Sequence, residues 1–154
     1  MLLKINPLLT GELLKRLDEM GHSDHLVIAD ANFPAHRINP DALEFPGVDI
    51  LAMTRAVCEV FPLDADNPPA LMDSGAPGLL PVHVKLLQAT GSTERTVVDR
   101  WAYYDLAASA SLIISTGELR LWANIVLYKG IALQPTLSND GTPTERTSRA
   151  DAGA

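Results

Sequence analysis

Cysteine, basic residues and long apolar runs are scarce in this chain of 154 residues. The single cysteine, Cys58, cannot form an internal disulfide bond and belongs to no obvious metal-ligand motif. The 19 acidic residues outnumber the 12 Lys and Arg residues, and a net charge of −7 argues against a nucleic-acid-binding surface. No apolar run approaches the roughly 20 residues of a membrane span, and the first residues do not resemble a signal peptide. These absences predict a cytoplasmic protein that binds neither nucleic acid nor membrane.

Aromatic residues are also few, at 5% of the chain, whereas hydrophobic residues make up 47%. A chain of this length and composition can form one domain with a sizeable core, built here from Leu, Ile, Val and Ala. Both tryptophans and all three tyrosines lie between positions 101 and 128. This late segment is therefore a candidate for function as well as for packing.

Apolar periodicity predicts an α/β protein. Helices are expected where apolar residues recur every three or four positions, at 10–20 with Thr10 as N-cap, 48–62, 81–91 ending at Gly91, and 101–110. Short apolar runs predict strands at 26–29, 70–73, 111–117 and 121–130, with a hairpin or a longer turn between the last two. Segment 36–47 is expected to be loop or a short strand, and 96–100 is ambiguous. The polar segment 134–154 is expected to be a disordered tail after a domain at 1–133.

Two ionisable residues flank the first predicted strand. His22 follows a helix end, where the partial negative charge favours the protonated imidazole, and imidazole suits acid/base chemistry near neutral pH. Asp30 ends the apolar strand, where a carboxylate must be solvated, paired or used. The alternatives are a surface turn histidine and a turn or cap aspartate. Both side chains could open into one cleft beyond the strand.

The aromatic segment supplies further candidates. Arg100 could pair with Asp99 or Asp105, or it could donate several hydrogen bonds to a polyhydroxylated ligand. Trp122 could cover the apolar face of a sugar ring, and the Asn124 amide can both donate to and accept from a hydroxyl. The alternative is a core tryptophan with an asparagine in a turn. No phosphate-binding loop or nucleophile elbow is present, and H-x-x-H at 22 and 25 is too weak a pattern to predict zinc.

Two separated segments resemble the RbsD/FucU family of ribose pyranases and fucose mutarotases. The first, INPLLTGELLKRLDEMGHSDHLVIADANFPAH, carries the family pattern I-x-P-L-L, M-G-H-x-D and A-D-A-N-F-P. The second, DRWAYYDLAASASLIISTGELRLWANIVLYKG, resembles R-x-A-F-Y-E, T-G-E and Y-(G/A)-N followed by I-x-L-x-K-G. The resemblance covers roughly residues 1–133, and the fucose-like Arg100 favours the fucose branch.

The resemblance implies a three-layer α/β fold, with a central sheet flanked by helices, that assembles into homo-oligomeric rings such as decamers. It implies that His22 is catalytic and that Asp30, Arg100 and Asn124 bind a monosaccharide, with no metal or other cofactor. Trp122 departs from the family, which usually has tyrosine at this position. Tyr103 or Tyr104 could supply the missing hydroxyl, and we place Tyr104 with Trp122 among the substrate-binding residues.

The function expected from these residues is interconversion of the anomers, or of the pyranose and furanose forms, of a monosaccharide such as L-fucose. Ring opening needs one group that takes a proton from the anomeric hydroxyl and another that donates one to the ring oxygen. Two other functions remain open from the sequence. One is a sugar-binding or regulatory ring protein without catalysis, and the other is a small α/β domain that serves only as an assembly partner.

Overall fold

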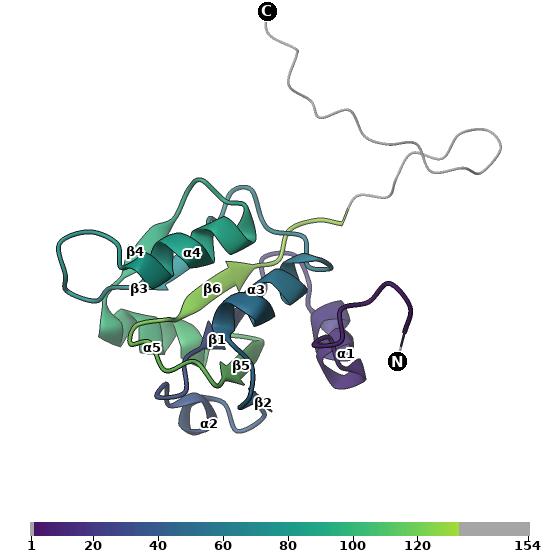
Figure 1. Cartoon of the computed structure of the whole chain (residues 1–154). Helices are drawn as coiled ribbons and strands as arrows, with labels where there is room; N and C mark the ends of the chain where they lie inside the picture. The colour runs from purple at the N-terminus through teal and green to yellow at the C-terminus, as the bar shows by residue number, and fades with distance from the viewer. Residues whose placement is uncertain (1, 133–154) are drawn as a thin grey trace, which may run out of the picture.

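Residues 2–132 are described by the computed structural model, and within them helices and strands alternate along the chain until the last two strands, which follow each other directly (Figure 1). The helices are α1 (Gly11–Glu19), α2 (Ala35–Ile38), α3 (Ile50–Cys58), α4 (Pro81–Thr90) and α5 (Arg100–Ala108). The strands are β1 (His25–Ala29), β2 (Leu43–Phe45), β3 (Ala70–Met72), β4 (Thr96–Val98), β5 (Leu112–Thr116) and β6 (Ile125–Tyr128). No helix in this part of the chain is long and apolar enough to cross a membrane.

The strands form one mixed sheet in the order β2-β5-β1-β6-β3-β4. Strand β1 is central: it pairs parallel with β5 on one side and antiparallel with β6 on the other. In register, Val27 lies between Ile113 of β5 and Val126 of β6. The carboxyl end of β1 therefore lies beside the amino end of β6, which places Asp30 near Asn124.

Alternation along the central strands creates two cores and three layers, as the resemblance implied. Leu26 and Ile28 of β1 pack in a cluster with α1, α3 and α4 on one face of the sheet. Val27 and Ala29 pack on the other face in a cluster that includes Phe33, α2 and α5. Side chains on a strand point to alternate faces, so an apolar run without alternation is what a strand covered on both faces requires.

Local signals predicted most helix boundaries. The Thr10 hydroxyl accepts a hydrogen bond from the Leu13 backbone N–H at 3.2 Å, so Thr10 is the N-cap of α1 as predicted. Gly91 ends α4 with a φ of 71°, a left-handed conformation that glycine adopts without strain. The helix predicted over 48–62 is shorter, because Asp49 caps its start and Glu59 its end.

The structure decides between the alternatives left open for the remaining segments and corrects others. Strands β5 and β6 are connected by the longer turn and form no hairpin, because β1 lies between them and pairs with both. Residues 121–124 form a turn before β6 instead of its first half, since Trp122 has a left-handed φ of 65° that no strand accommodates. Segment 36–47 holds the short helix α2 as well as β2, and the ambiguous 96–100 contains β4. The predicted tail, 134–154, lies outside the described residues.

Gly117, directly after β5, brings two backbone segments together. Its N–H donates to the Val48 carbonyl at 3.0 Å, and a Cβ added at Gly117 would overlap the Pro46 carbonyl. Only glycine allows this approach between the end of β5 and the loop before α3. The loop that follows, 118–124, starts from this anchored position.

We predict that Gly117→Ala lowers the free energy of unfolding by about 3 kcal/mol, because neither backbone segment can move away without breaking its own contacts. Gly11→Ala is the matched control, since a Cβ at this helical glycine meets nothing within 4 Å. Urea denaturation of both variants measures the difference. Equal stability of the two variants would contradict the close approach.

Candidate functional site

The base of the site is a pair of hydrogen bonds between Asp30 and Asn124. The Asn124 amide donates to the Asp30 carboxylate at 2.9 Å, and its oxygen accepts from the Asp30 backbone N–H at 3.0 Å. The carboxylate also accepts from the Asn32 backbone N–H at 2.9 Å. Asp30 and Asn124 are only 4% and 2% exposed. The ends of β1 and β6 are therefore joined by two buried polar side chains that satisfy each other.

Burial raises the pKa of the Asp30 carboxyl above its usual range, although the hydrogen bonds from Asn32 and Asn124 oppose the shift. The nearby Glu118 carboxylate raises it further. A buried carboxylate with a perturbed pKa in a pocket is a candidate for function. It can accept hydrogen bonds from ligand hydroxyls or exchange a proton with them.

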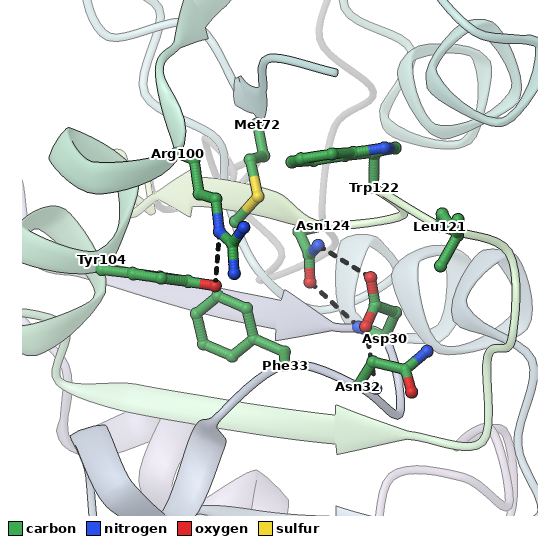
Figure 2. Close-up of a pocket in the computed structure, with 9 residues that line it drawn as sticks. All are labelled: Asp30, Asn32, Phe33, Met72, Arg100, Tyr104, Leu121, Trp122 and Asn124. Carbon is green, nitrogen blue, oxygen red and sulfur yellow. Dashed lines mark hydrogen bonds between the residues drawn. The ribbon is translucent and has the colours of Figure 1, made fainter. Parts of the chain in front are cut away.

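A pocket opens above this pair, with a volume of about 180 Å³ (Figure 2). Its polar side chains come from the end of β1, from α5 and from the turn before β6, while apolar side chains complete the walls. The lining residues are Asp30, Asn32, Phe33, Met72, Arg100, Tyr104, Leu121, Trp122 and Asn124. Five of the six predicted site residues are thus brought together: Asp30, Arg100, Tyr104, Trp122 and Asn124.

Arg100 opens α5 and extends into the pocket. Its Nε donates to the Tyr104 hydroxyl at 3.1 Å, and its guanidinium lies 5.2 Å from the Trp101 ring centroid and 5.6 Å from that of Tyr104. Neither Asp99 nor Asp105 forms an ion pair with it among residues 2–132. The guanidinium is thus oriented by aromatic contacts and keeps donors available for a ligand.

The two neighbouring tyrosines on α5 differ in the burial and the hydrogen bonding of their hydroxyls. Tyr103 is fully buried, and its hydroxyl has no hydrogen-bond partner among the described residues. Tyr104 lines the pocket, and its hydroxyl oxygen accepts from Arg100. Because the oxygen is already used as an acceptor, the phenolic proton is free to be donated. Of the two, Tyr104 is the one whose hydroxyl a pocket ligand could reach.

His22, the predicted catalytic residue, does not line this pocket. It precedes β1 whereas Asp30 follows it, and this five-residue strand separates them by roughly 16 Å at 3.3 Å per residue. The expectation that both side chains open into one cleft of a single chain is therefore wrong. The residue before a strand and the residue after it lie at opposite ends of that strand, and here these ends are too far apart for one cleft.

Asp64 accompanies His22 at that opposite edge, a partner that sequence reasoning missed. Its carboxylate lies 3.6 Å from His22 Nε2 and accepts from the Asn67 amide at 2.8 Å. The Asn67 hydrogen bond, with one from the Asp66 backbone, holds the pKa of Asp64 below its usual range. The side chain of Asp64 is 5% exposed, and that of His22 is 52% exposed. An exposed imidazole beside a fixed carboxylate is able to exchange a proton with a group that approaches it.

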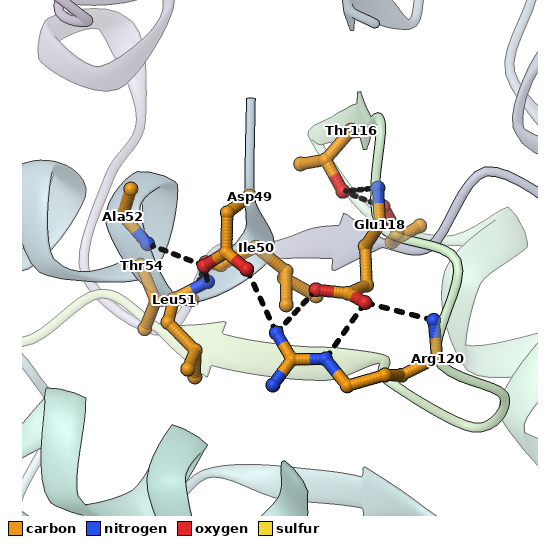
Figure 3. A network of polar contacts seen from close by, with 9 residues as sticks. Asp49, Ile50, Leu51, Ala52, Thr54, Thr116, Glu118 and Arg120 are labelled. Atoms are coloured by element: carbon orange, nitrogen blue, oxygen red, sulfur yellow. Dashed lines mark hydrogen bonds and ion pairs between the residues drawn. The ribbon is translucent and has the colours of Figure 1, made fainter. Parts of the chain in front are cut away.

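A polar network of Asp49, Glu118 and Arg120 holds the loop that precedes Trp122 (Figure 3). Arg120 Nε donates to the Glu118 carboxylate at 2.8 Å, and its terminal nitrogen reaches Asp49 at 2.8 Å. The hydrogen bonds from Arg120 are the main reason that the pKa of Glu118 falls to about 2. The Glu118 carbonyl accepts from the Ala31 backbone N–H at 2.8 Å. The network thus ties the loop to the start of α3 and to the residue after Asp30.

Comparison with known proteins identifies the family. A sequence model described as the RbsD / FucU transport protein family matches residues 3–132. The chain belongs to the RbsD/FucU family. Its sheet and helices match those of the solved RbsD and FucU structures, as the resemblance implied.

Three solved structures illustrate the likeness. The fucose mutarotase of Streptococcus pneumoniae, in complex with L-fucose, is 30% identical, with a TM-score of 0.79 over 86% of this chain and 100% of that one. FucU of Bifidobacterium longum is 34% identical, with a TM-score of 0.77 over 84% of this chain and 99% of that one. Bacillus subtilis RbsD, complexed with D-ribose, shares the fold at 22% identity, with a TM-score of 0.69 over 84% and 99% of the two chains.

Proposed function

We propose that the chain is a cofactor-free mutarotase that interconverts the ring forms of a monosaccharide such as L-fucose. The observation that carries the proposal is the pocket at the carboxyl end of β1, which gathers Asp30, Asn124, Arg100 and Tyr104 beneath the Trp122 indole. The size of the pocket and its mixture of apolar and hydrogen-bonding side chains support a sugar as the ligand. The similarity to a fucose mutarotase structure supports the reaction type.

The size and lining of the pocket favour a single sugar. Its volume of about 180 Å³ is below the roughly 300–1,000 Å³ typical of sites for drug-sized ligands. Phe33, Met72 and Trp122 offer apolar surface, and the Asp30–Asn124 pair offers hydrogen-bond acceptors and donors at the base. A monosaccharide has this mixture, because its ring has C–H faces and hydroxyl edges.

The proposed mechanism is acid/base-assisted ring opening. One group removes the proton of the anomeric hydroxyl while another protonates the ring oxygen, and reclosure on the other face of the carbonyl gives the second anomer. Asp30, Asn124 and Arg100 hold the sugar hydroxyls, and Trp122 covers the ring. Tyr104, in place of the tyrosine that the family usually has at the position of Trp122, donates its phenolic proton to the ring oxygen. His22 accepts the proton of the anomeric hydroxyl, and both transfers reverse when the ring closes.

His22 can act on the pocket only if it comes from another copy of the chain. We therefore propose that the functional form is a homo-oligomer, a ring in which the His22–Asp64 edge of one copy faces the pocket of the next. Exposed apolar side chains support a protein contact on this side. Leu121, which lines the pocket, is 65% exposed, Leu119 in the same loop is 76% exposed, and Trp101 on α5 is 69% exposed. Trp101 packs edge-on against Tyr104 with ring centroids 5.8 Å apart.

Replacement of His22 tests the catalytic assignment. His22→Ala is expected to slow anomer exchange of L-fucose by at least about 100-fold, since a positioned acid/base group contributes roughly 10²–10⁴ in rate. Calorimetric affinity for the sugar should change much less. Saturation-transfer NMR between the two anomers measures the rate. His36→Ala is the control, because His36 is equally exposed and pairs with Glu44 away from the pocket.

Two results would contradict this assignment in different ways. Full exchange by His22→Ala would remove His22 from the mechanism while leaving the mutarotase proposal intact. Sugar binding by the wild type without enhanced exchange would instead select the non-catalytic sugar-binding protein. The observation that favours this non-catalytic alternative is the distance of His22 from the pocket of its own chain.

Light scattering tests the assembly. The wild type should elute with the mass of several chains, and Leu121→Glu should lower that mass because it buries a charge in the proposed contact. Val84→Glu, another exposed apolar residue but on α4, is the control and should leave the mass unchanged. A monomeric wild type would contradict the shared site.

A further inference from the structure

Trp122 has an unusual backbone for a residue that forms a pocket wall. Its φ of 65° lies in the left-handed region, which is unfavourable for a bulky side chain unless surrounding contacts fix it. Its carbonyl accepts the Asn124 backbone N–H at 2.9 Å, which closes a tight turn. A second contact on the same carbonyl comes from outside the pocket.

That second contact is His83, in the first turn of α4. His83 Nε2 lies 2.9 Å from the Trp122 carbonyl, and the Leu80 backbone N–H points at Nδ1 at 3.4 Å. Because Leu80 donates to Nδ1, that nitrogen carries a lone pair, so the proton is on Nε2 and is donated to Trp122. The side chain is 2% exposed. His83 is thus a buried donor aimed at the strained turn.

A series of hydrogen bonds connects His83 through the turn to Asp30 at the base of the pocket. The Trp122 carbonyl binds both His83 and the Asn124 N–H, and the Asn124 side chain binds Asp30 at 2.9 Å. His83 does not line the pocket itself. It therefore lies behind the wall, where it can fix both the indole of Trp122 and the amide of Asn124 without touching a ligand.

We propose that His83 is a positioning residue that sets the affinity of the pocket for its sugar by holding the Trp122–Asn124 turn. The inference rests on the proposed function for its ligand, a monosaccharide. A role limited to the stability of α4 would affect folding but would leave the affinity of the folded protein unchanged. The two roles therefore separate in a measurement of binding.

The test compares three variants with the wild type. His83→Leu removes the donor, and His83→Gln keeps a side-chain N–H that can reach the carbonyl. Leu86→Val is the matched control, since Leu86 is fully buried in the same helix and has no part in the turn. Calorimetry gives the Kd for L-fucose, and saturation-transfer NMR gives the exchange rate at saturating sugar. The Trp122 indole N–H signal, assigned from the spectrum of Trp101→Phe, reports the turn.

We expect His83→Leu to raise the Kd about tenfold, to change the exchange rate at saturation less than about threefold, and to shift the Trp122 indole signal. His83→Gln should recover most of the affinity, and Leu86→Val should retain the wild-type Kd. A Kd for His83→Leu within twofold of that for Leu86→Val would overturn the proposal. So would a wild-type His83 whose ¹⁵N shifts show the proton on Nδ1, a measurement that needs no variant to fold.

Failure of the proposed function would give different results from failure of the positioning role of His83. In that case the wild type itself would neither bind nor exchange any monosaccharide of a panel. The Trp122 indole signal would then decide the positioning role alone, and an unshifted signal in His83→Leu would overturn it. A shift in that variant, absent from Leu86→Val, would support it.

Discussion

The paired hydrogen bonds between Asp30 and Asn124 are the constraint on which the rest of the site depends. They join the end of β1 to the residue before β6, and they satisfy a carboxylate that would otherwise be costly to bury. The turn that carries Trp122 ends at Asn124, and the loop before it is held by Glu118 and Arg120. A shift of Asn124 would therefore disturb the pocket base and one of its walls together.

The position of β1 explains why the pocket residues and His22 lie apart in one chain. The strand is fully buried at Leu26–Ala29 and pairs on both sides, so it cannot bend to bring its two ends together. Its carboxyl end holds hydrogen-bonding groups with little exposure, and its amino end holds an exposed histidine beside a fixed carboxylate. This separation is the reason for the proposal that neighbouring copies complete each other's site.

Local sequence signals were sufficient where the determining interactions are local. The apolar run before Asp30 predicted a strand covered on both faces, and Thr10 and Gly91 marked helix ends through contacts within a few residues. The strand order was not predictable in this way, because the pairing of β1 with both β5 and β6 depends on contacts far apart in sequence. The left-handed turn at Trp122 was missed for a similar reason, since one of the two contacts on its carbonyl comes from His83, 39 residues away in the sequence.

The same distinction between local and distant determinants applies to the residues of the candidate site. Side chains that belong to recognisable motifs, such as Asp30, Arg100 and Asn124, were predicted and lie together. Asp64 and His83 stand in segments without a distinctive pattern, and only the fold shows that they lie beside His22 and the Trp122 carbonyl. The separation of His22 from Asp30 was hidden because nearness in sequence says little about which end of a strand a side chain occupies.

A mixing experiment tests the shared site most directly. His22→Ala and Asp30→Asn each remove one half-site, so each variant alone should exchange L-fucose anomers slowly. If the halves come from different copies, random co-assembly of the two variants restores both intact halves at about a quarter of the sites, and exchange should recover to about that fraction of the wild-type rate. A mixture that is no faster than the two variants measured separately would contradict the account.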